Sequence, residues 1–435
     1  MDNYDTVIVG AGFTGLTAAY ELSKQGKKVL VVESDSSAGG LAGTFTFPDG
    51  VRLEKFYHHW FNNDTELPRL ARELGLEQDI LCLPTRTGIF FNGRIWNLST
   101  PLDLLRFTPL SFIDRLRLGF LVLLVRRIKD WKTIEHLSIR EWLEPLCGKA
   151  VYRLVWEPLI TSKFSIYAET INAVWMWKKL VLRGGTRNSS GGEELVYFKG
   201  GFGRLTDALE MAITNAGGKV LYGVHVTGVV TDGTLLLALQ TDQGDIAGKR
   251  FLFTPAFPII ADLFAKAGPD AWVASLRRVR YLANICLVLR LRQNLSTTYW
   301  LNVNDPGFPF VGVIEHTNFD TPQNYNGSHI VFLSKYLSTD DPIWQDSDSE
   351  YFAFAFAHLK RMFPHLDASG VTGYSVWRTP YGQHVTERGY SDYVPAHETP
   401  YENAWVATMA QIYPEDRGTN YAIRDGKNIA AILAG

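Results

Sequence analysis

A strand–turn–helix–strand pattern in the first 33 residues constrains the fold most strongly. "YDTVIVGAGFTGLTAAYELSKQGKKVLVVE" begins at Tyr4 and joins two short apolar runs through a glycine-rich turn and an amphipathic stretch. The pattern predicts strands over 6–9 and 29–32, with a helix between them that ends at Gly26. The turn contains G-x-G-x-x-G, whose glycines permit a tight turn, close approach of the backbone to a diphosphate and close helix–strand packing.

Glu33 ends the second predicted strand, where a carboxylate can accept hydrogen bonds from both ribose hydroxyls of an adenosine and would repel a 2′-phosphate. The helix amino terminus adds free N–H groups for the diphosphate. The pattern therefore predicts an adenine dinucleotide site but does not distinguish NAD from FAD. The residues expected there are Gly10, Gly12, Phe13, Thr14, Gly15, Glu33 and Ser34.

A second glycine pair follows in "VVESDSSAGGLAGTF", where Gly39 and Gly40 lie six and seven residues after Glu33. This stretch resembles the second glycine motif of the superfamily of flavin-containing amine oxidases, protoporphyrinogen oxidase and phytoene desaturase. The resemblance implies FAD as the cofactor, with Gly39, Gly40, Leu41 and Ala42 near its ribityl-diphosphate part. The alternative is an ordinary surface Gly-Gly turn.

Two later segments extend the resemblance. Leu195 to Gly233 is similar to the family's central FAD segment, in which Val226 matches a valine whose backbone meets the adenine. A second dinucleotide fingerprint for NADPH is disfavoured there because Thr206 occupies the third glycine position. The carboxyl terminus resembles the closing flavin motif, although "AQIYPEDRG" lacks the usual Gly-Asp pair and offers only Asp416 nearby. The expected contacts at this last helix start are Gly418, Thr419, Asn420 and Tyr421.

The resemblance implies an α/β fold with an α+β substrate region. A discontinuous, Rossmann-like FAD-binding domain of the glutathione-reductase/amine-oxidase type would comprise residues 1–60, 193–280 and 396–435. The substrate-binding domain would comprise residues 61–96 and 281–395, and residues 97–192 would form a helical insertion. A length of 435 residues accommodates such an arrangement.

The expected catalytic residues lie outside the FAD motifs. "LEKFYHHWFNND" resembles a histidine-containing stretch beside the flavin in UDP-galactopyranose mutases, which makes His58 and His59 candidates. If this stretch is a strand, only one of the two faces the flavin. Lys163 lies in a segment similar to the substrate domain of protoporphyrinogen-oxidase-like proteins. Tyr381 and His384 follow in a Pro- and Gly-rich stretch that we expect to be a turn. Each alternative is structural: a core histidine, a surface lysine or a plain turn.

Composition excludes several other classes. The formal net charge is -2, so no basic field indicates nucleic acid binding. Three dispersed cysteines and ten histidines without ligand spacing argue against a disulfide framework and a metal site. The chain begins without a secretory signal, so a cytoplasmic location is expected by default. The oligomeric state is left open.

Residues 111–132 contain the apolar run Leu116 to Val125, which is too short to span a bilayer. Flanking Arg and Lys residues suggest a peripheral membrane contact, and the alternative that we favour at this level is a helix buried in the substrate domain.

The sequence thus predicts an FAD-dependent oxidoreductase that oxidises a C–H or C–N bond of a small apolar or cyclic substrate by hydride transfer to flavin N5, with oxygen or another acceptor reoxidising the flavin. One alternative is a redox-neutral mutase like UDP-galactopyranose mutase, which would pair Arg378 with Arg183 or Arg187. A second is a non-catalytic binding protein like the Rab GDP-dissociation inhibitors, which the intact glycine set disfavours.

Overall fold

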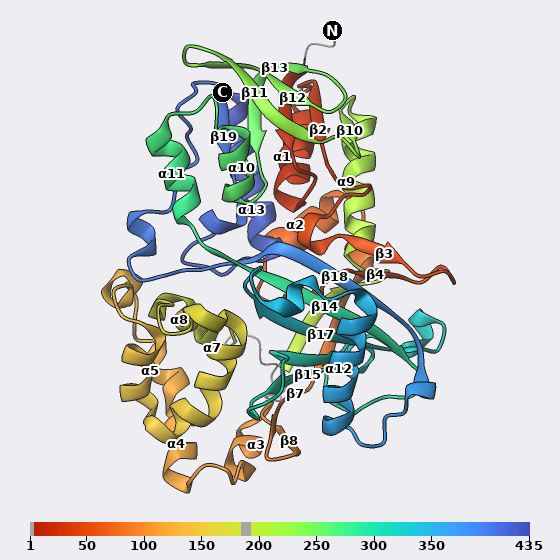
Figure 1. The fold of residues 1–435 in the computed structure, drawn as a ribbon, viewed down its shortest axis with the longest axis vertical. Coiled ribbons are helices and arrows are strands. Elements are labelled where there is room, and N and C mark those ends of the chain that lie inside the picture. The colour runs from red at the N-terminus through yellow and green to blue at the C-terminus, as the bar shows by residue number, and fades with distance from the viewer. Residues whose placement is uncertain (1–3, 184–192) are drawn as a thin grey trace.

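The structure, a computed structural model, describes residues 4–183 and 193–435. It consists of an upper part that carries both described chain ends and a lower part that contains a second large sheet and most of the short helices (Figure 1). The chain passes between the two parts several times. The upper part therefore combines segments far apart in sequence, as the expected discontinuous domain requires.

A seven-stranded sheet forms the centre of the upper part. Its strands in spatial order are β10 (Lys219–Leu221), β2 (Val29–Val32), β1 (Tyr4–Val9), β13 (Ile246–Phe253), β12 (Leu235–Thr241) and β11 (Val226–Asp232), and β19 (Ala404–Val406) also pairs with β13. Strand β1 runs parallel to β2 and β13, with Val7 opposite Leu30 and Phe251. Strand β2 (VLVV) is apolar and buried along its whole length, as expected for a strand whose sheet is covered by helices on both faces.

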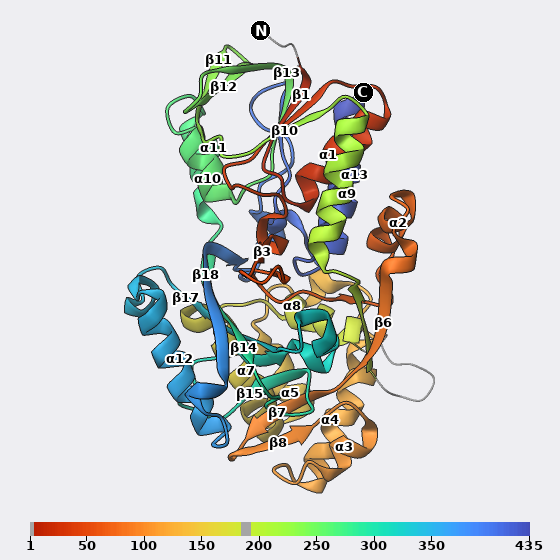
Figure 2. The same cartoon turned by 90° about the vertical axis from the view of Figure 1, so that its right-hand side faces the viewer.

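Helices lie on both faces of this sheet (Figure 2). On one face lie α1 (Phe13–Lys24), α9 (Phe202–Asn215) and α13 (Thr419–Ala434), and on the other lie α10 (Phe257–Leu263) and α11 (Asp270–Arg278). Helices α1 and α13 approach closely at Gly426, where an added Cβ would lie 2.5 Å from the Thr14 carbonyl oxygen. The last helix is therefore fixed against the first.

A second seven-stranded sheet forms the lower part. In spatial order it contains β18 (Val371–His384), β14 (Tyr281–Leu291), β17 (His329–Leu337), β16 (Gly312–Glu315), β15 (Trp300–Val303), β7 (Thr87–Phe91) and β8 (Arg94–Asn97). Alternate residues of β14 enter two different cores: Ile285 and Leu287 pack in the cluster that includes α12 (Asp348–Met362), whereas Cys286 and Val288 face the opposite side. The sheet therefore separates two cores.

Short helices fill the remaining lower part: α3 (Pro101–Arg106), α4 (Phe112–Val125), α5 (Ile139–Cys147), α6 (Lys149–Val151), α7 (Glu157–Phe164) and α8 (Ala173–Arg183). Capping boxes start two of them, Thr100 with Asp103 at α3 and Ser138 with Glu141 at α5. Their shared core contains many aromatic side chains, including Trp142, Trp175 and Trp177. Part of the chain's 13% aromatic content therefore serves packing.

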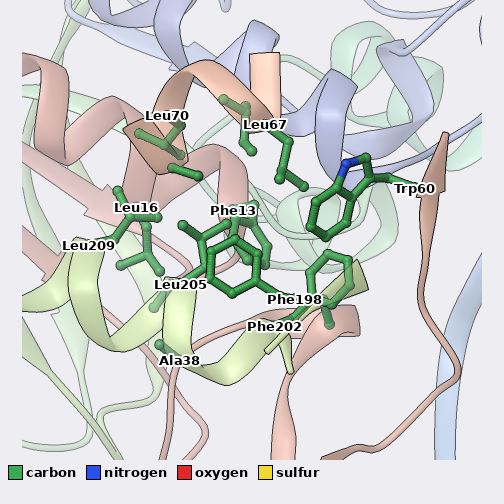
Figure 3. Close-up of a cluster of buried hydrophobic side chains, with 14 of the residues drawn as sticks. Phe13, Leu16, Ala38, Trp60, Leu67, Leu70, Phe198, Phe202, Leu205 and Leu209 are labelled. Carbon is green, nitrogen blue, oxygen red and sulfur yellow. The ribbon is translucent and has the colours of Figure 1, made fainter. Parts of the chain in front are cut away.

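Two small sheets and one helix connect the parts. They are β3 (Thr44–Thr46) with β4 (Arg52–Glu54), β5 (Trp60–Phe61) with β9 (Glu193–Phe198) and β6 (Ile80–Thr85), and α2 (Glu66–Glu73). Trp60 packs against Phe198 and Phe202, with ring centroids 5.9 and 5.4 Å apart (Figure 3). This packing fixes the chain just after the His58–His59 pair.

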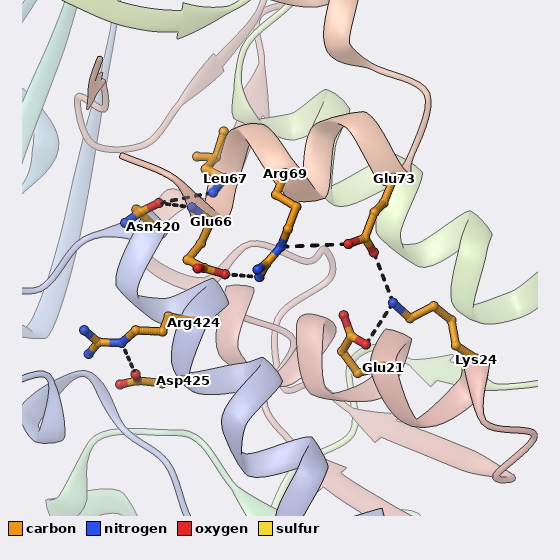
Figure 4. Close-up of polar contacts among 9 residues, drawn as sticks. All are labelled: Glu21, Lys24, Glu66, Leu67, Arg69, Glu73, Asn420, Arg424 and Asp425. Atoms are coloured by element: carbon orange, nitrogen blue, oxygen red, sulfur yellow. Dashed lines mark hydrogen bonds and ion pairs between the residues drawn. The ribbon is translucent and has the colours of Figure 1, made fainter. Parts of the chain in front are cut away.

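Two features differ from the sequence-based expectation. The stretch "TPYGQH" is part of the 14-residue strand β18 rather than a turn. As an end strand of its sheet, β18 tolerates Pro380, and a register shift opposite Leu282 and Asn284 accommodates the irregularity. Helix α2, placed with the substrate region, instead packs on α13, where Asn420 Oδ1 accepts hydrogen bonds from the backbone N–H groups of Glu66 (2.8 Å) and Leu67 (3.1 Å) (Figure 4).

Candidate active site

A cavity of about 770 Å³ opens at the carboxyl ends of β1 and β2, beside the amino terminus of α1. Many residues expected to bind the cofactor line it, although they come from four separate segments. They are Gly10, Gly12, Phe13, Thr14, Glu33, Ser34, Gly39, Gly40, Leu41, Ala42, Val226, Gly418 and Thr419. We call this space the first cavity.

The two glycine turns contact each other at the wall of the first cavity. Gly39 N–H donates to the Ala11 carbonyl at 2.9 Å, and a Cβ on Gly40 would lie 3.3 Å from Gly12 Cα. Gly39 has a φ of 116°, which disfavours any side chain. The Gly39-Gly40 pair is therefore required by the close approach of two backbone segments, which an ordinary surface turn does not need.

Gly15 acts behind the cavity wall. A Cβ there would lie 2.1 Å from the Gly10 carbonyl oxygen, so this glycine permits the helix to pack against the turn. At Gly12, by contrast, a Cβ would meet no protein atom within 4 Å and would project into the cavity that Gly12 lines. Both positions fit the roles that a dinucleotide-binding turn gives its glycines.

Polar groups in the first cavity suit an adenosine diphosphate. The Glu33 carboxylate faces the cavity and accepts hydrogen bonds from the backbone N–H groups of Ala11 (2.7 Å) and Asp35 (2.9 Å). The N-caps of helices α1 and α13 are Gly12 and Gly418, neither of which supplies a capping side chain, so the first N–H groups of both helices are available to an anionic ligand. The residues present therefore fit FAD.

A second cavity of about 300 Å³ adjoins the first. The two share the following lining residues: Leu41, Phe56, His58, Thr379, Arg417, Gly418 and Thr419. Aromatic rings form much of the second wall, contributed by the segment from the end of β4 through β5, by the turn before α7, by α8, β15 and β17, and by the start of α13. These rings belong to Phe56, Tyr57, Trp60, Phe61, Trp156, Trp175, Trp300, Tyr336 and Tyr421.

His58 and His59 lie in an irregular segment between β4 and β5 rather than in a strand, because β4 ends at Glu54. His58 lines both cavities, and its Nδ1 donates to the Phe56 carbonyl at 2.7 Å, which leaves Nε2 as an acceptor in the neutral ring. Burial lowers the pKa of His58 to about 4. His59 lines only the second cavity, where Nδ1 lies 2.9 Å from the Tyr299 hydroxyl.

Lys163, Tyr336 and Arg417 form a cationic cluster in the second cavity. Arg417 donates to the Tyr336 hydroxyl at 2.9 Å and to Gln383 Oε1 at 3.0 Å, and Lys163 Nζ lies 4.5 Å from the centre of the Tyr336 ring. Burial lowers the pKa of Lys163. Burial alone would raise the pKa of Tyr336, but the adjacent Lys163 and Arg417 outweigh it and hold that pKa below its ordinary value.

Two carboxylates also line the second cavity. Asp416, considered above as a substitute for the missing Gly-Asp pair, is buried and forms an ion pair with Lys179 at 2.7 Å. Its pKa is low because Lys179, Lys163 and Arg417 together outweigh burial. Asp64 accepts from the Phe61 N–H at 3.0 Å, and burial raises its pKa to about 6.

The remaining expected residues are placed differently. Tyr381 lines the first cavity and packs edge-on against Tyr281. His384, the last residue of β18, lines neither cavity; it is fully buried, and its ring nitrogens have no hydrogen-bond partner among the described residues. Asn420 and Tyr421 line the second cavity rather than the first, and the Asn420 side-chain oxygen is engaged by α2. Within the described residues no cluster of three or more His, Cys, Asp or Glu could bind a metal.

Sequence reasoning missed Arg417, Tyr336 and Asp64. Arg417 directly precedes the expected helix start at Gly418, and Asp64 ends the quoted histidine segment. Asn284, which also lines the second cavity, is one of two strongly polar residues in the long apolar strand β14, the other being Arg290, and this pattern is the sequence signal that could have found it.

Comparisons with known proteins agree with this geometry. The family model for flavin containing amine oxidoreductases matches residues 13–434. Coproporphyrinogen III oxidase from Staphylococcus aureus is 23% identical over 293 residues, covering 60% of this chain and 62% of that protein. The chain covers less than two thirds of the length of the curated relatives it matches.

Two solved structures show the same fold. An oxidoreductase from Methanosarcina mazei aligns with a TM-score of 0.76 at 18% identity, over 98% of this chain and 99% of that one. Cyclohexylamine oxidase from Brevibacterium oxydans aligns with a TM-score of 0.75 at 16% identity, over 100% and 99%. The family match, which implies FAD and an oxidoreductase, covers nearly the whole chain: the protein belongs to the flavin containing amine oxidoreductase family.

Proposed function

We propose that the protein oxidises a C–H or C–N bond of a small apolar or cyclic substrate, with FAD in the first cavity and the substrate in the second. The observation that carries this proposal is the junction of the two cavities at His58, Arg417 and Gly418. When bound, FAD supplies a two-electron acceptor that takes up a hydride. The substrate carbon would lose a hydride and the neighbouring atom a proton, and oxygen or another acceptor would be consumed in each turnover.

The second cavity supports the substrate class. Its volume of about 300 Å³ suits a small molecule, and rings such as Trp156, Trp175 and Trp300 provide flat apolar walls. Cyclohexylamine oxidase, one of the structural neighbours, is named for a small cyclic amine. The proposed role of the aromatic wall is to orient the substrate and to exclude water from the reacting bond.

Charged side chains of the second cavity can hold or move a proton. Lys163 has a lowered pKa, so a larger fraction of its amine is neutral and able to accept a proton from the substrate. His58 is neutral near pH 7 because its pKa is about 4, and its Nε2 is suited to accepting a hydrogen bond. We assign Lys163 as the candidate base and His58 as a positioning group at the junction.

Anaerobic mixing tests the proposal. The flavin-loaded protein is mixed with cyclic amines, aromatic amines and unsaturated ring compounds, and loss of the oxidised flavin absorbance is followed. At least one substrate class should reduce the flavin, and under air it should consume an acceptor in proportion to product. Trp300→Ala should lower kcat/KM at least tenfold (about 1.4 kcal/mol) with unchanged flavin content. Trp272→Ala on α11, whose side chain lines neither cavity, is the matched control.

The alternatives predict other outcomes. A mutase would convert a sugar nucleotide with reduced flavin and no net use of an acceptor. Arg378, its proposed diphosphate ligand, is engaged by Asp348 and the Asp346 carbonyl, while Arg187 and the Arg183 side chain lie outside the described residues. A binding protein would leave the flavin oxidised with every compound. Either result would contradict the proposed oxidation.

A further inference from the structure

Helix α4 is apolar on two faces. On one side, Leu121 and Val125 are fully buried and Leu118 packs on the same core. At about 100° per residue, six other apolar side chains among those that the structure describes fall within an arc of about 120° on the opposite side. They are exposed: Phe112, Ile113, Leu116, Phe120, Leu123 and Leu124, with exposed fractions from 36% to 63%. A surface helix normally has only one apolar face.

Helix α3 extends the exposed apolar surface with Leu102 (53%) and Leu105 (44%). The Arg115 guanidinium donates to the Leu105 carbonyl and so ties α3 to α4. Both views place α3 and α4 at the end of the molecule opposite the termini (Figures 1 and 2). We call these eight side chains the apolar patch. An exposed patch of this kind marks an interaction surface.

Basic side chains surround the apolar patch. Residues 101–132 contain seven Lys and Arg but only three Asp, whereas the whole chain has a net charge of -2. Asp103 is used in the capping box of α3, and Asp114 binds Ser111 and Arg117. The exposed cations include Arg106, Arg117, Arg127, Lys129 and Lys132. Positive charge is therefore concentrated around exposed apolar side chains.

We propose that the apolar patch docks on the surface of an anionic phospholipid bilayer, with α4 lying in the interface. Apolar side chains would enter the boundary between headgroups and acyl chains, and the surrounding cations would attract lipid phosphates. Helix α4 has 14 residues, about 21 Å of length, so it lies on a bilayer rather than spanning it. Correspondingly, none of the described helices has the length and apolarity to cross a membrane.

A second copy of this chain fits the same patch less well. In a two-fold contact the same surface meets itself, so the cations around one patch would face those around the other. A bilayer that contains anionic lipid complements both the apolar centre and the basic rim. This charge complementarity selects the bilayer as the occupant.

The docking surface is also connected to the second cavity. Trp177 on α8 donates its indole N–H to the Val125 carbonyl at 3.0 Å, at the end of α4. On the same helix, Trp175, Met176 and Lys179 line the second cavity. The cavity is therefore one helix away from the proposed membrane surface, a suitable arrangement for an apolar substrate that partitions into lipid.

Vesicle co-sedimentation tests the docking. The full chain is mixed with vesicles of phosphatidylcholine alone or with an equal amount of phosphatidylglycerol. The protein should partition at least about tenfold more strongly onto the anionic vesicles, and salt should weaken binding. Ile113→Asp combined with Phe120→Asp should reduce binding at least about tenfold, because two charges would enter the apolar interface.

Met211→Asp on α9 is the matched control, because Met211 is also 63% exposed but lies in the upper part. It should leave vesicle binding unchanged. Bound flavin and the melting temperature report folding for every variant. The proposal is overturned if neither vesicle binds the protein, or if Ile113→Asp/Phe120→Asp binds as the parent does. It is also overturned if sedimentation velocity shows a dimer that this variant dissociates, because a second copy would then cover the patch.

Discussion

The walls of the two adjoining cavities differ, because one is formed mainly by backbone and the other mainly by side chains. The first cavity is shaped largely by backbone: two glycine turns in contact and two helix amino termini. The second is shaped by large aromatic and charged side chains from segments as distant as residues 56 and 421. The first therefore suits a ligand of fixed chemistry, whereas the second can change specificity by side-chain replacement alone. Substitutions in each cavity can therefore test whether the two cavities act separately.

The largest effect is expected from Gly12→Leu. The new side chain would project into the first cavity without meeting protein, so FAD binding should weaken at least about 100-fold, or about 2.7 kcal/mol, while the fold is retained. Flavin absorbance per chain and the melting temperature of the apoprotein measure the two effects. Gly370→Leu is the control, because Gly370 also has open space and no positive φ. Normal flavin content in Gly12→Leu would refute the placement of FAD.

Arg417→Met should affect the junction of the cavities. Its guanidinium donates to Tyr336 and Gln383, and the substitution removes a buried charged donor from each of these acceptors. We expect kcat to fall about 100-fold (about 2.7 kcal/mol) and the pKa of Tyr336 to rise. Steady-state kinetics and a spectroscopic titration of tyrosinate measure the two. An active variant with an unchanged tyrosine titration would show that the cluster does not act at the site.

Lys163→Met should act on the second cavity alone. We expect kcat/KM to fall about tenfold (about 1.4 kcal/mol), and the FAD dissociation constant should stay within about twofold, or about 0.4 kcal/mol, because Lys163 lines only the second cavity. Stopped-flow reduction and flavin titration separate the two. Lys149→Met on the exposed surface serves as the control. A large loss of FAD affinity would contradict the division between the cavities.

The smallest effect concerns Asp64. Burial raises its pKa to about 6, so the carboxyl is neutral below that pH and charged above it. With a cationic amine substrate, kcat/KM should rise a few-fold, less than about 1 kcal/mol, as the pH increases through 6, and Asp64→Asn should remove this inflection. The pH dependence of FAD binding should be the same in both proteins. An inflection that persists in Asp64→Asn would assign it to another group.

The contribution of Asp64 to folding stability changes with pH in the opposite direction to its expected effect on kcat/KM. Since its folded pKa is raised above the ordinary value of 3.8, the folded state retains the proton more strongly, and this contribution to stability is lost as pH rises from about 4 to about 6. The pH dependence of urea unfolding for the parent and Asp64→Asn measures this contribution.

The same contrast explains what could be predicted from sequence. Few other residues can replace glycine in a tight turn, so the spacing of the glycines was a usable sequence signal. Gly10, Gly12, Gly39 and Gly40 were predicted from it, and all four line the first cavity. The family resemblance carried by these motifs likewise implied the α/β class, which the structure and the family match confirm.

The second cavity could not be predicted in this way. Arg417 and Tyr336 are 81 residues apart and meet only because β17 and the segment before α13 converge. Local pattern also misplaced the stretch around Tyr381 and His384, because a Pro-Gly turn signal was overridden by pairing of β18 with β14. Tertiary pairing decides such positions.

A crystal structure of the FAD-bound protein tests the central claim most directly. We expect one FAD through the first cavity, with the adenosine at Glu33 and the flavin ring at the junction, bordered by His58 and Arg417 and exposed to the second cavity. A flavin ring turned away from that junction, or FAD bound elsewhere on the chain, would contradict it.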